Sequence, residues 1–198
     1  MAVIGLSKPY YATYTNTSGT VTYGDLVSLA KACEMSIDLD DAEDVILYAD
    51  NGPAERAAGF TGGTLTLTID ELSIAAAGAI LGVSPASSVS PSGSNNVLTF
   101  GGNTAAPYLG FGIVVKKQVS NSIKWMAVAL KKVQFHMPNI EAVTQGESIE
   151  FQTPELTATI LRDDSSSQNW AAWAMFDSED NAVTWLSEAL PKPVTTGP

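Results

Sequence analysis

The stretch that decides the fold is residues 108–136, which read YLGFGIVVKKQVSNSIKWMAVALKKVQFH. Two long runs, 108–118 and 123–136, are rich in β-branched and aromatic residues and flank the polar segment 119–122. Such runs on either side of a turn segment are typical of a β-hairpin. The two-residue period of a strand predicts that one face of the second run carries Ile123, Trp125, Ala127, Ala129, Val133 and Phe135.

Further strands are expected on both sides of this hairpin, at residues 29–39, 64–69, 148–162 and 169–176. Short spacings between at least six strands favour an antiparallel β-sandwich or barrel over parallel βαβ units. In 29–39 the alternation places five side chains on the apolar face, so that the single cysteine is predicted to be a small core residue: Leu29, Cys33, Met35, Ile37 and Leu39. The tryptophans are also predicted to be core residues: Trp125, Trp170, Trp173 and Trp185.

Two helices are expected to flank the sheet. The second, 178–190, has Ser178 as a capping residue and one apolar stripe, so it covers a sheet with one face. The first, 70–81, fits a capping box formed by Thr68 and Glu71. Its apolar residues surround the whole axis, and such a helix must be covered on all sides. The second cover is expected to come from a loop or from another chain.

Charge is segregated along the 198 residues, which carry 21 acids, 10 bases and a net charge of −11. Residues 25–71 sum to −9, residues 72–140 to +5 and residues 141–198 to −8. This acidity disfavours nucleic-acid binding, which depends on neutralising phosphates. The segregation of charge suggests that an acidic end of one copy meets the lysine-bearing hairpin of the next copy. In that case, association between copies weakens as the salt concentration rises.

The residue types exclude several kinds of active site. One cysteine and one histidine, His136, rule out an intrachain disulfide and any site that needs two imidazoles. Asp38 and Asp40 lie about 7 Å apart if they share a strand face, as in some glycosidases, but a solvated strand end is the simpler interpretation. No cofactor, metal or catalytic residue is predicted, and the chain is expected not to be an enzyme. The longest apolar run, 74–83, is too short for a membrane span.

An ordered series of segments resembles the major tail proteins, or tail tube proteins, of long-tailed bacteriophages with non-contractile tails. The likeness covers residues 5–190, apart from the Ser/Pro/Gly-rich stretch 83–106. The segments that carry it are Gly5-Leu6 with Lys8-Pro9-Tyr10-Tyr11-Ala12, Val21-Thr22-Tyr23-Gly24, Leu47-Tyr48-Ala49-Asp50-Asn51-Gly52, Gly62-Gly63-Thr64-Leu65-Thr66-Leu67, Ala106-Pro107-Tyr108-Leu109-Gly110-Phe111-Gly112, Glu147-Ser148-Ile149-Glu150-Phe151-Gln152-Thr153-Pro154 and a closing helix that bears a tryptophan.

The resemblance implies one tail-tube-like domain over 1–190, with 82–106 as a loop or arm and 191–198 as a flexible tail. It further implies hexameric rings that stack into the tube of a virion tail after assembly in the host cytoplasm. A sheet from each subunit would join its neighbours to line the lumen, and DNA would pass without specific binding. The implied partners are other copies of the chain, a tape-measure protein and the tail terminator and distal tail proteins.

The expected subunit contacts combine the first helix, the uncharged stretch from Leu72 to Val115 and the lysines of the hairpin. The candidate residues are Leu72, Ile74, Ile80, Leu81, Val97, Phe100, Lys116, Lys117 and Lys124. Two other classes stay open. One is a binding or decoration module of a virion or cell surface, such as an immunoglobulin-like adhesion domain, that uses exposed aromatic residues. The other is an acidic carbohydrate-active enzyme that uses Asp38 and Asp40.

Overall fold

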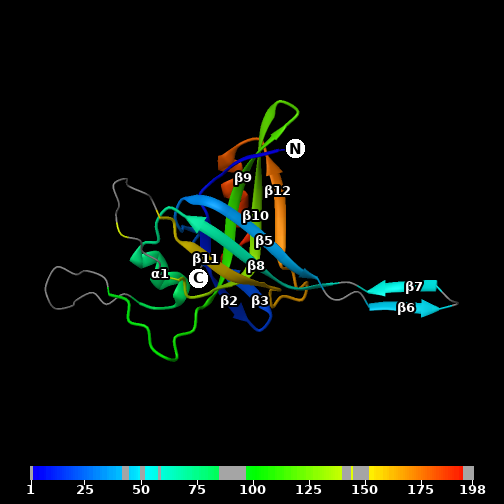
Figure 1. Cartoon of the computed structure of the whole chain (residues 1–198), viewed down its shortest axis with the longest axis horizontal. Helices are drawn as coiled ribbons and strands as arrows, with labels where there is room; N and C mark the ends of the chain where they lie inside the picture. Colours follow the sequence, from blue (N-terminus) through cyan, green and yellow to red (C-terminus); the bar gives the residue numbers. More distant parts are fainter. Residues whose placement is uncertain are drawn as a thin grey trace, which may run out of the picture.

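A computed structural model describes residues 2–41, 45–49, 52–57, 59–84, 97–139, 144 and 152–193 (Figure 1). The expected mainly β, antiparallel fold with two helices is confirmed: ten strands form one antiparallel sheet, and two further strands pair with each other. The strands are β1 (Ala2–Leu6), β2 (Tyr10–Thr17), β3 (Thr20–Tyr23), β4 (Val27–Ser28), β5 (Ala32–Asp41), β6 (Val45–Ala49), β7 (Gly52–Ala57), β8 (Phe60–Ile69), β9 (Tyr108–Val119), β10 (Ser122–Phe135), β11 (Glu155–Leu161) and β12 (Ala171–Phe176). The helices are α1 (Ile74–Leu81) and α2 (Glu179–Ala189).

The predicted hairpin is the central pair, β9 and β10, joined where Val119 faces Ser122. Its two turn residues both have left-handed backbones, with φ of 46° at Ser120 and 63° at Asn121. Two positive φ values are the signature of the tight turn whose twist matches that of the flanking strands. The turn therefore holds the tip of the hairpin in one defined conformation.

Each outer edge of this hairpin is shared by two strands. On β9, β1 pairs with residues 115–118 and β2 pairs with residues 109–112. On β10, β12 pairs with residues 125–130 and β11 pairs with residues 132–135. We call 113–130 the tip half of the hairpin, and 108–112 with 131–135 its base half. From the base half the sheet continues through β11 to β8 and β5, which cross in front of the hairpin in Figure 1.

A β-bulge in β10 corrects the prediction that six of its side chains share one face. The register shifts between Leu130 and Val133, and an extra residue at this point moves the following side chains to the opposite face. Ala127 and Ala129 pack beneath α2, whereas Val133 and Phe135 belong to the core on the other side of the sheet.

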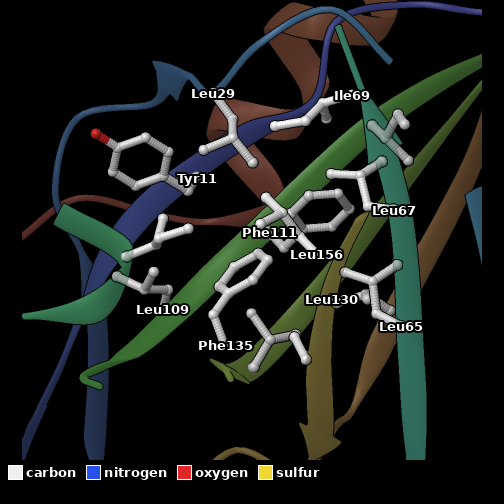
Figure 2. Packing of buried hydrophobic residues seen from close by; sticks show 14 of the residues in the cluster. Tyr11, Leu29, Leu65, Leu67, Ile69, Leu109, Phe111, Leu130, Phe135 and Leu156 are labelled. Atoms are coloured by element: carbon white, nitrogen blue, oxygen red, sulfur yellow. The ribbon is translucent and has the colours of Figure 1, made fainter. Parts of the chain in front are cut away.

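The main core lies between the hairpin and the crossing layer of β8 and β11, and Figure 2 shows Phe111 and Phe135 at its centre. The smaller core lies between the opposite face of the sheet and α2. This helix matches its predicted position, since the Ser178 hydroxyl accepts a hydrogen bond from the Asn181 N–H at 3.3 Å. The predicted C-terminal tail begins in contact with this domain, because the Tyr23 N–H donates to the Pro191 carbonyl at 2.9 Å.

Helix α1 begins later than predicted, and its cap is a different residue. Thr68 lies within β8, so it cannot form the capping box with Glu71. The Ser73 side chain caps the helix instead by accepting from the Ala76 N–H at 3.2 Å. Gly82, with φ of 72°, ends the helix in the left-handed conformation that favours glycine.

Cys33 is exposed, which corrects its predicted place in the core. The ladder between β5 and β8 pairs Ala32 with Ile69 and Glu34 with Thr68, the residue before Ile69. Two residues on β5 thus correspond to one on β8, and Cys33 is the extra residue of a bulge. Because the bulge resets the alternation, Met35 and Ile37 still pack against the main core while Cys33 does not.

Candidate self-association surface

Part of the predicted contact set is already used inside the subunit. Ile80 is 0% exposed and Leu81 is buried beside it, since this side of α1 packs on the main core. Leu72 is half-buried against the same core. Ile80 and Leu81 are therefore core residues, and this part of the prediction is corrected. The other side of α1 is open, because Ile74 is 47% exposed.

The predicted residues of the uncharged stretch lie partly at the surface. Phe100 is exposed and Val97 is half-buried, while residues 85–96 of the predicted arm lie outside the described residues. The side chains of Phe100 and Ile74 are thus accessible to another molecule, although they belong to different segments.

The three predicted lysines gather at the tip of the hairpin. Lys117 stands directly opposite Lys124, and Lys116 stands opposite Trp125 with its Nζ 5.3 Å from the centre of the indole ring. Lys124 forms an ion pair with Asp177. Within the part of the chain that the structure describes, neither Lys116 nor Lys117 contacts a carboxylate. Since like charges directly opposite each other destabilise a sheet, an acidic partner outside the subunit would stabilise this tip.

Exposed apolar side chains on β12 and β1 were not predicted. Trp173, expected in the core, is 58% exposed, and Met175 on the same strand is exposed as well. On β1, Val3 is 62% exposed and Ile4 is also open to solvent. A signal existed in the sequence: residues 171–176 and 2–6 are too apolar for ordinary solvent-facing strands. What it lacked was the information that both strands lie at the rim of the sheet.

The register places these side chains on one face of the sheet. Trp173 pairs with Val128 and Met175 with Met126, on the face away from α2. Val3 pairs with Lys117, which stands opposite Lys124, and Lys124 shares its face with Met126 two residues on. Trp173, Met175 and Val3 therefore point the same way from the two outer strands of the tip half.

These two outer strands each have a free edge. Among the described residues, β1 pairs only with β9 and β12 pairs only with β10, so the tip half is a four-stranded sheet in the order β1-β9-β10-β12. All three ladders are antiparallel, so β1 and β12 run in opposite directions. A free strand edge presents unpaired N–H and C=O groups that another strand can pair with.

Trp173 is held in place by an aromatic cluster next to the first residue of β12. Its ring packs edge-on against Trp170 with centroids 6.3 Å apart, and Trp170 stacks on Phe60 at 4.7 Å. The Arg162 guanidinium lies 5.9 Å from the centre of the Phe60 ring. Because its neighbours are packed on the main core, the exposed indole of Trp173 is partly preorganised for contact.

A polar cluster joins the base half of the hairpin to β2 and to the loop at 163–169. Lys132 Nζ donates to both carboxylate oxygens of Asp164 at 2.9 and 2.8 Å and lies 4.3 Å from the centre of the Tyr108 ring. Tyr14 Oη donates to Asp164 Oδ2 at 2.8 Å and accepts from the Asp164 N–H at 2.9 Å. The Lys132 ammonium lowers the pKa of Asp164, and burial raises the pKa of Tyr14 to about 12. The mutual pairing connects β2 and β10 to the loop at 163–169.

Of the residues considered for chemistry, Asp38 and Asp40 lie on β5, and His136 directly follows β10. Asp38 and Asp40 are exposed, and the Ser36 hydroxyl donates to Asp38 at 3.1 Å. His136 Nε2 lies 2.8 Å from the Thr159 hydroxyl. The described residues contain no group of three or more His, Cys, Asp or Glu side chains that could hold a metal ion. No described helix has the length and apolar character needed to cross a membrane.

Comparison with protein-family models gives no match, and neither does comparison with curated proteins. The functional conclusion therefore depends on the free edges, the exposed apolar residues and the resemblance of the sequence segments.

Proposed function

We propose that the chain is a structural, self-assembling protein of a phage-type tail tube. In this proposal, copies join side by side through the edges of β1 and β12 into closed rings, hexameric as the resemblance implies. The rings stack into a conduit for DNA. No catalysis is involved, and the partners are other copies together with the tape-measure, terminator and distal tail proteins that the resemblance implies.

The observation that carries this proposal is the pair of free, apolar edges on the four-stranded tip sheet. A second copy that places its β1 beside β12 forms an antiparallel joint, since the two strands run in opposite directions. The same operation can then be repeated from copy to copy. Such a head-to-tail contact closes into a ring when the rotation between copies is right.

The exposed side chains supply much of the stabilisation of such a joint. Trp173 and Met175 lie on one edge strand, and Val3 and Ile4 lie on the other. Burying a large apolar side chain fully contributes about 1.5–3 kcal/mol, so the four together contribute on the order of several kcal/mol per joint. New backbone hydrogen bonds between the two edges stabilise the joint further and fix the direction in which the strands pair.

The charge of the chain supports a conduit that does not retain DNA. A net charge of −11 repels the phosphate backbone over the surface as a whole. Three of the lysines that could attract it, Lys116, Lys117 and Lys124, lie at the hairpin tip, where Lys124 is paired with Asp177. An acidic wall would let a polynucleotide pass without a strong contact.

A second function fits one of the same observations. The exposed Trp173 beside Trp170 could act as an aromatic platform for a ligand, as in a binding or decoration module. Such a module would use the tryptophan as a monomer, whereas the tube subunit buries it between copies. The two functions therefore differ in what covers Trp173: a ligand bound to the monomer, or a second copy of the chain.

Assembly of purified protein distinguishes the two. We expect rings or tubes in negative-stain images as the concentration rises, and we expect Trp173→Asp to remain monomeric because it places a charge in the joint. Val27→Asp is the matched control, since Val27 is also exposed but lies on β4, away from both edges. Circular dichroism spectra should be the same for all three chains.

Two results would contradict the tube proposal. One is a wild-type chain that stays monomeric at millimolar concentration, and the other is Trp173→Asp assembling as well as the control. Saturable binding of a monomer to a glycan array, lost in Trp173→Asp, would favour the binding module instead.

A further inference from the structure

We propose that the tip of the β9–β10 hairpin in one copy docks into a pocket at the base of the same hairpin in a second copy, in the adjacent ring. The proposal rests on the proposed function and names the contact along the tube axis. The joint between β1 and β12 forms across the strand direction, whereas this contact forms along it. Two different surfaces of the subunit would thus serve ring closure and ring stacking.

The tip is a rigid, amphipathic projection. Ile123 is 50% exposed two residues after the left-handed Asn121, and Lys117 and Lys116 lie on β9 next to its partner Gln118. Figure 1 shows the tip extending beyond the rest of the sheet at the top of the view. Because the turn is tight, presenting Ile123 to a partner requires little loss of backbone freedom.

The pocket lies at the other end of the hairpin, beside the end of α1. Its volume is about 220 Å³, and it is lined by Leu81, Thr104, Ala106, Gln134, Phe135, His136 and Met137. Leu81 and Phe135 are buried, while Met137 is exposed. Gln134 Nε2 donates to the Ala106 carbonyl at 2.8 Å, which fastens the loop that forms one wall. The pocket is therefore preformed, and none of its lining residues is a lysine, arginine or carboxylate.

One copy cannot fill its own pocket. Twelve residue steps of β10 separate Ile123 from Phe135, which corresponds to about 40 Å at the usual rise of a strand. A tip that fills a pocket must therefore come from another copy. A contact between two different surfaces of identical chains propagates in one direction, as a stack of rings requires.

Shape and charge both fit this occupant. A pocket lined by Leu81, Phe135 and Met137, without a lysine, arginine or carboxylate, suits the branched alkyl side chain of Ile123. At the same end of the sheet, the His136 N–H donates to the Thr157 carbonyl. Glu155 is exposed and precedes Thr157 by two residues on the antiparallel strand, so it lies beyond His136 at this end of the sheet. Glu155 of the copy that holds the pocket can then approach Lys116 or Lys117 of the copy that supplies the tip, since neither lysine contacts a carboxylate in the described part of its own chain.

Cross-linking tests the contact directly. In a Cys33→Ser background, Ile123→Cys and Met137→Cys are combined and treated with a short bismaleimide. We expect a ladder of covalent multimers on a denaturing gel, whereas each single-cysteine chain should not give one. The matched control replaces Met137→Cys by Val27→Cys, which is also exposed but lies on β4, away from the pocket. A ladder of equal length from this control would overturn the proposal.

Assembly of Ile123→Asp gives a second, independent result. We expect rings that close but fail to stack, with the tubes of the wild type lost from negative-stain images and the circular dichroism unchanged. Tubes of wild-type length from this variant contradict the axial contact alone. A wild-type chain that forms no rings contradicts the proposed function, and this contact falls with it.

Discussion

The two halves of the β9–β10 hairpin belong to the same pair of strands but differ in what covers them. In the base half, Phe111 and Phe135 are enclosed between the hairpin and the crossing strands, as Figure 2 shows. In the tip half, α2 covers one face over Ala127 and Ala129, while the other face ends in the exposed Trp173 and Met175. Both halves contribute buried residues to the cores, but the sheet of the tip half also has exposed apolar surface to bury against another chain.

This difference teaches that one long element can serve folding and association at once. A strand of 14 residues is longer than one small core needs, so its far end extends beyond the layer that covers the rest. Substitutions of buried residues in the base half should reduce stability, whereas substitutions of the exposed residues of the tip half, such as Ile123, should change assembly and leave stability nearly intact. The following predictions test this division, from the largest expected effect to the smallest.

The largest effect is expected for Ile80→Asp, in the helix that covers the base half. Ile80 is fully buried, so the substitution places an unpaired carboxylate in the main core and should cost at least about 4 kcal/mol of the free energy of unfolding. Ile74→Asp in the same helix is the control, because Ile74 is exposed and should change stability by less than about 1 kcal/mol. Urea unfolding followed by tryptophan fluorescence measures both. Equal losses would mean that α1 does not distinguish a core side from an open side.

A smaller effect is expected for Gly110→Ala in the base half. A Cβ atom at Gly110 would lie 2.7 Å from Cδ1 of the Tyr23 ring and 3.0 Å from Cδ2 of Leu190. Overpacking of this kind costs about 1–3 kcal/mol. Gly5→Ala beside the tip half is the control, because the nearest atom to its new Cβ is Lys116 Cβ at 3.9 Å. A thermal melt should show a lower midpoint for the first variant only, and the reverse order would contradict the assignment of the two halves.

The smallest effect concerns the polar cluster of the base half and depends on pH. Hydrogen bonds from Lys132 and Tyr14 hold the pKa of Asp164 below its ordinary value of 3.8. A carboxylate with a lowered pKa stabilises the fold above the ordinary value, and this stabilisation is lost as the pH falls through the lowered one. The difference in unfolding free energy between wild type and Asp164→Asn should therefore shrink below about pH 4.

Asp180→Asn is the control for this pH dependence. Asp180 lies in the first turn of α2 and makes no ion pair with a described residue, so Asp180→Asn removes a carboxylate without removing an ion pair. If both variants gave the same curve, the pairing of Asp164 with Lys132 would not contribute measurably.

Features that depend on neighbouring residues could be predicted well. The hairpin, its turn and the capped helix α2 follow from the alternation of side chains, from residues 119–122 and from Ser178, all of which act within a few residues. Helix α1 was predicted with the wrong cap because Thr68 satisfies a local motif but pairs with β5 and β11 instead. Sheet pairing overrode the local preference at that point.

The contact residues were predicted less well, for a related reason. Ile80 and Trp173 are both large and apolar, and nothing in their immediate sequence distinguishes a residue that lies under a sheet from one at its rim. The bulges at Cys33 and between Leu130 and Val133 are also invisible in the alternation, since each one reverses it midway. A pattern of period two indicates two faces but does not state which face is covered along the whole strand.

By itself, the sequence determined an acidic, mainly β chain that is built on one long hairpin and has two helices near the positions predicted for them. It could do so because propensity, capping and alternation act over a few residues. Only the tertiary structure decided that Ile80 is enclosed, that Trp173 is open and that β1 and β12 each pair with a single strand among the described residues. Whether an apolar side chain is buried depends on which distant strands cross above it. The residues next to it in the sequence do not determine that crossing.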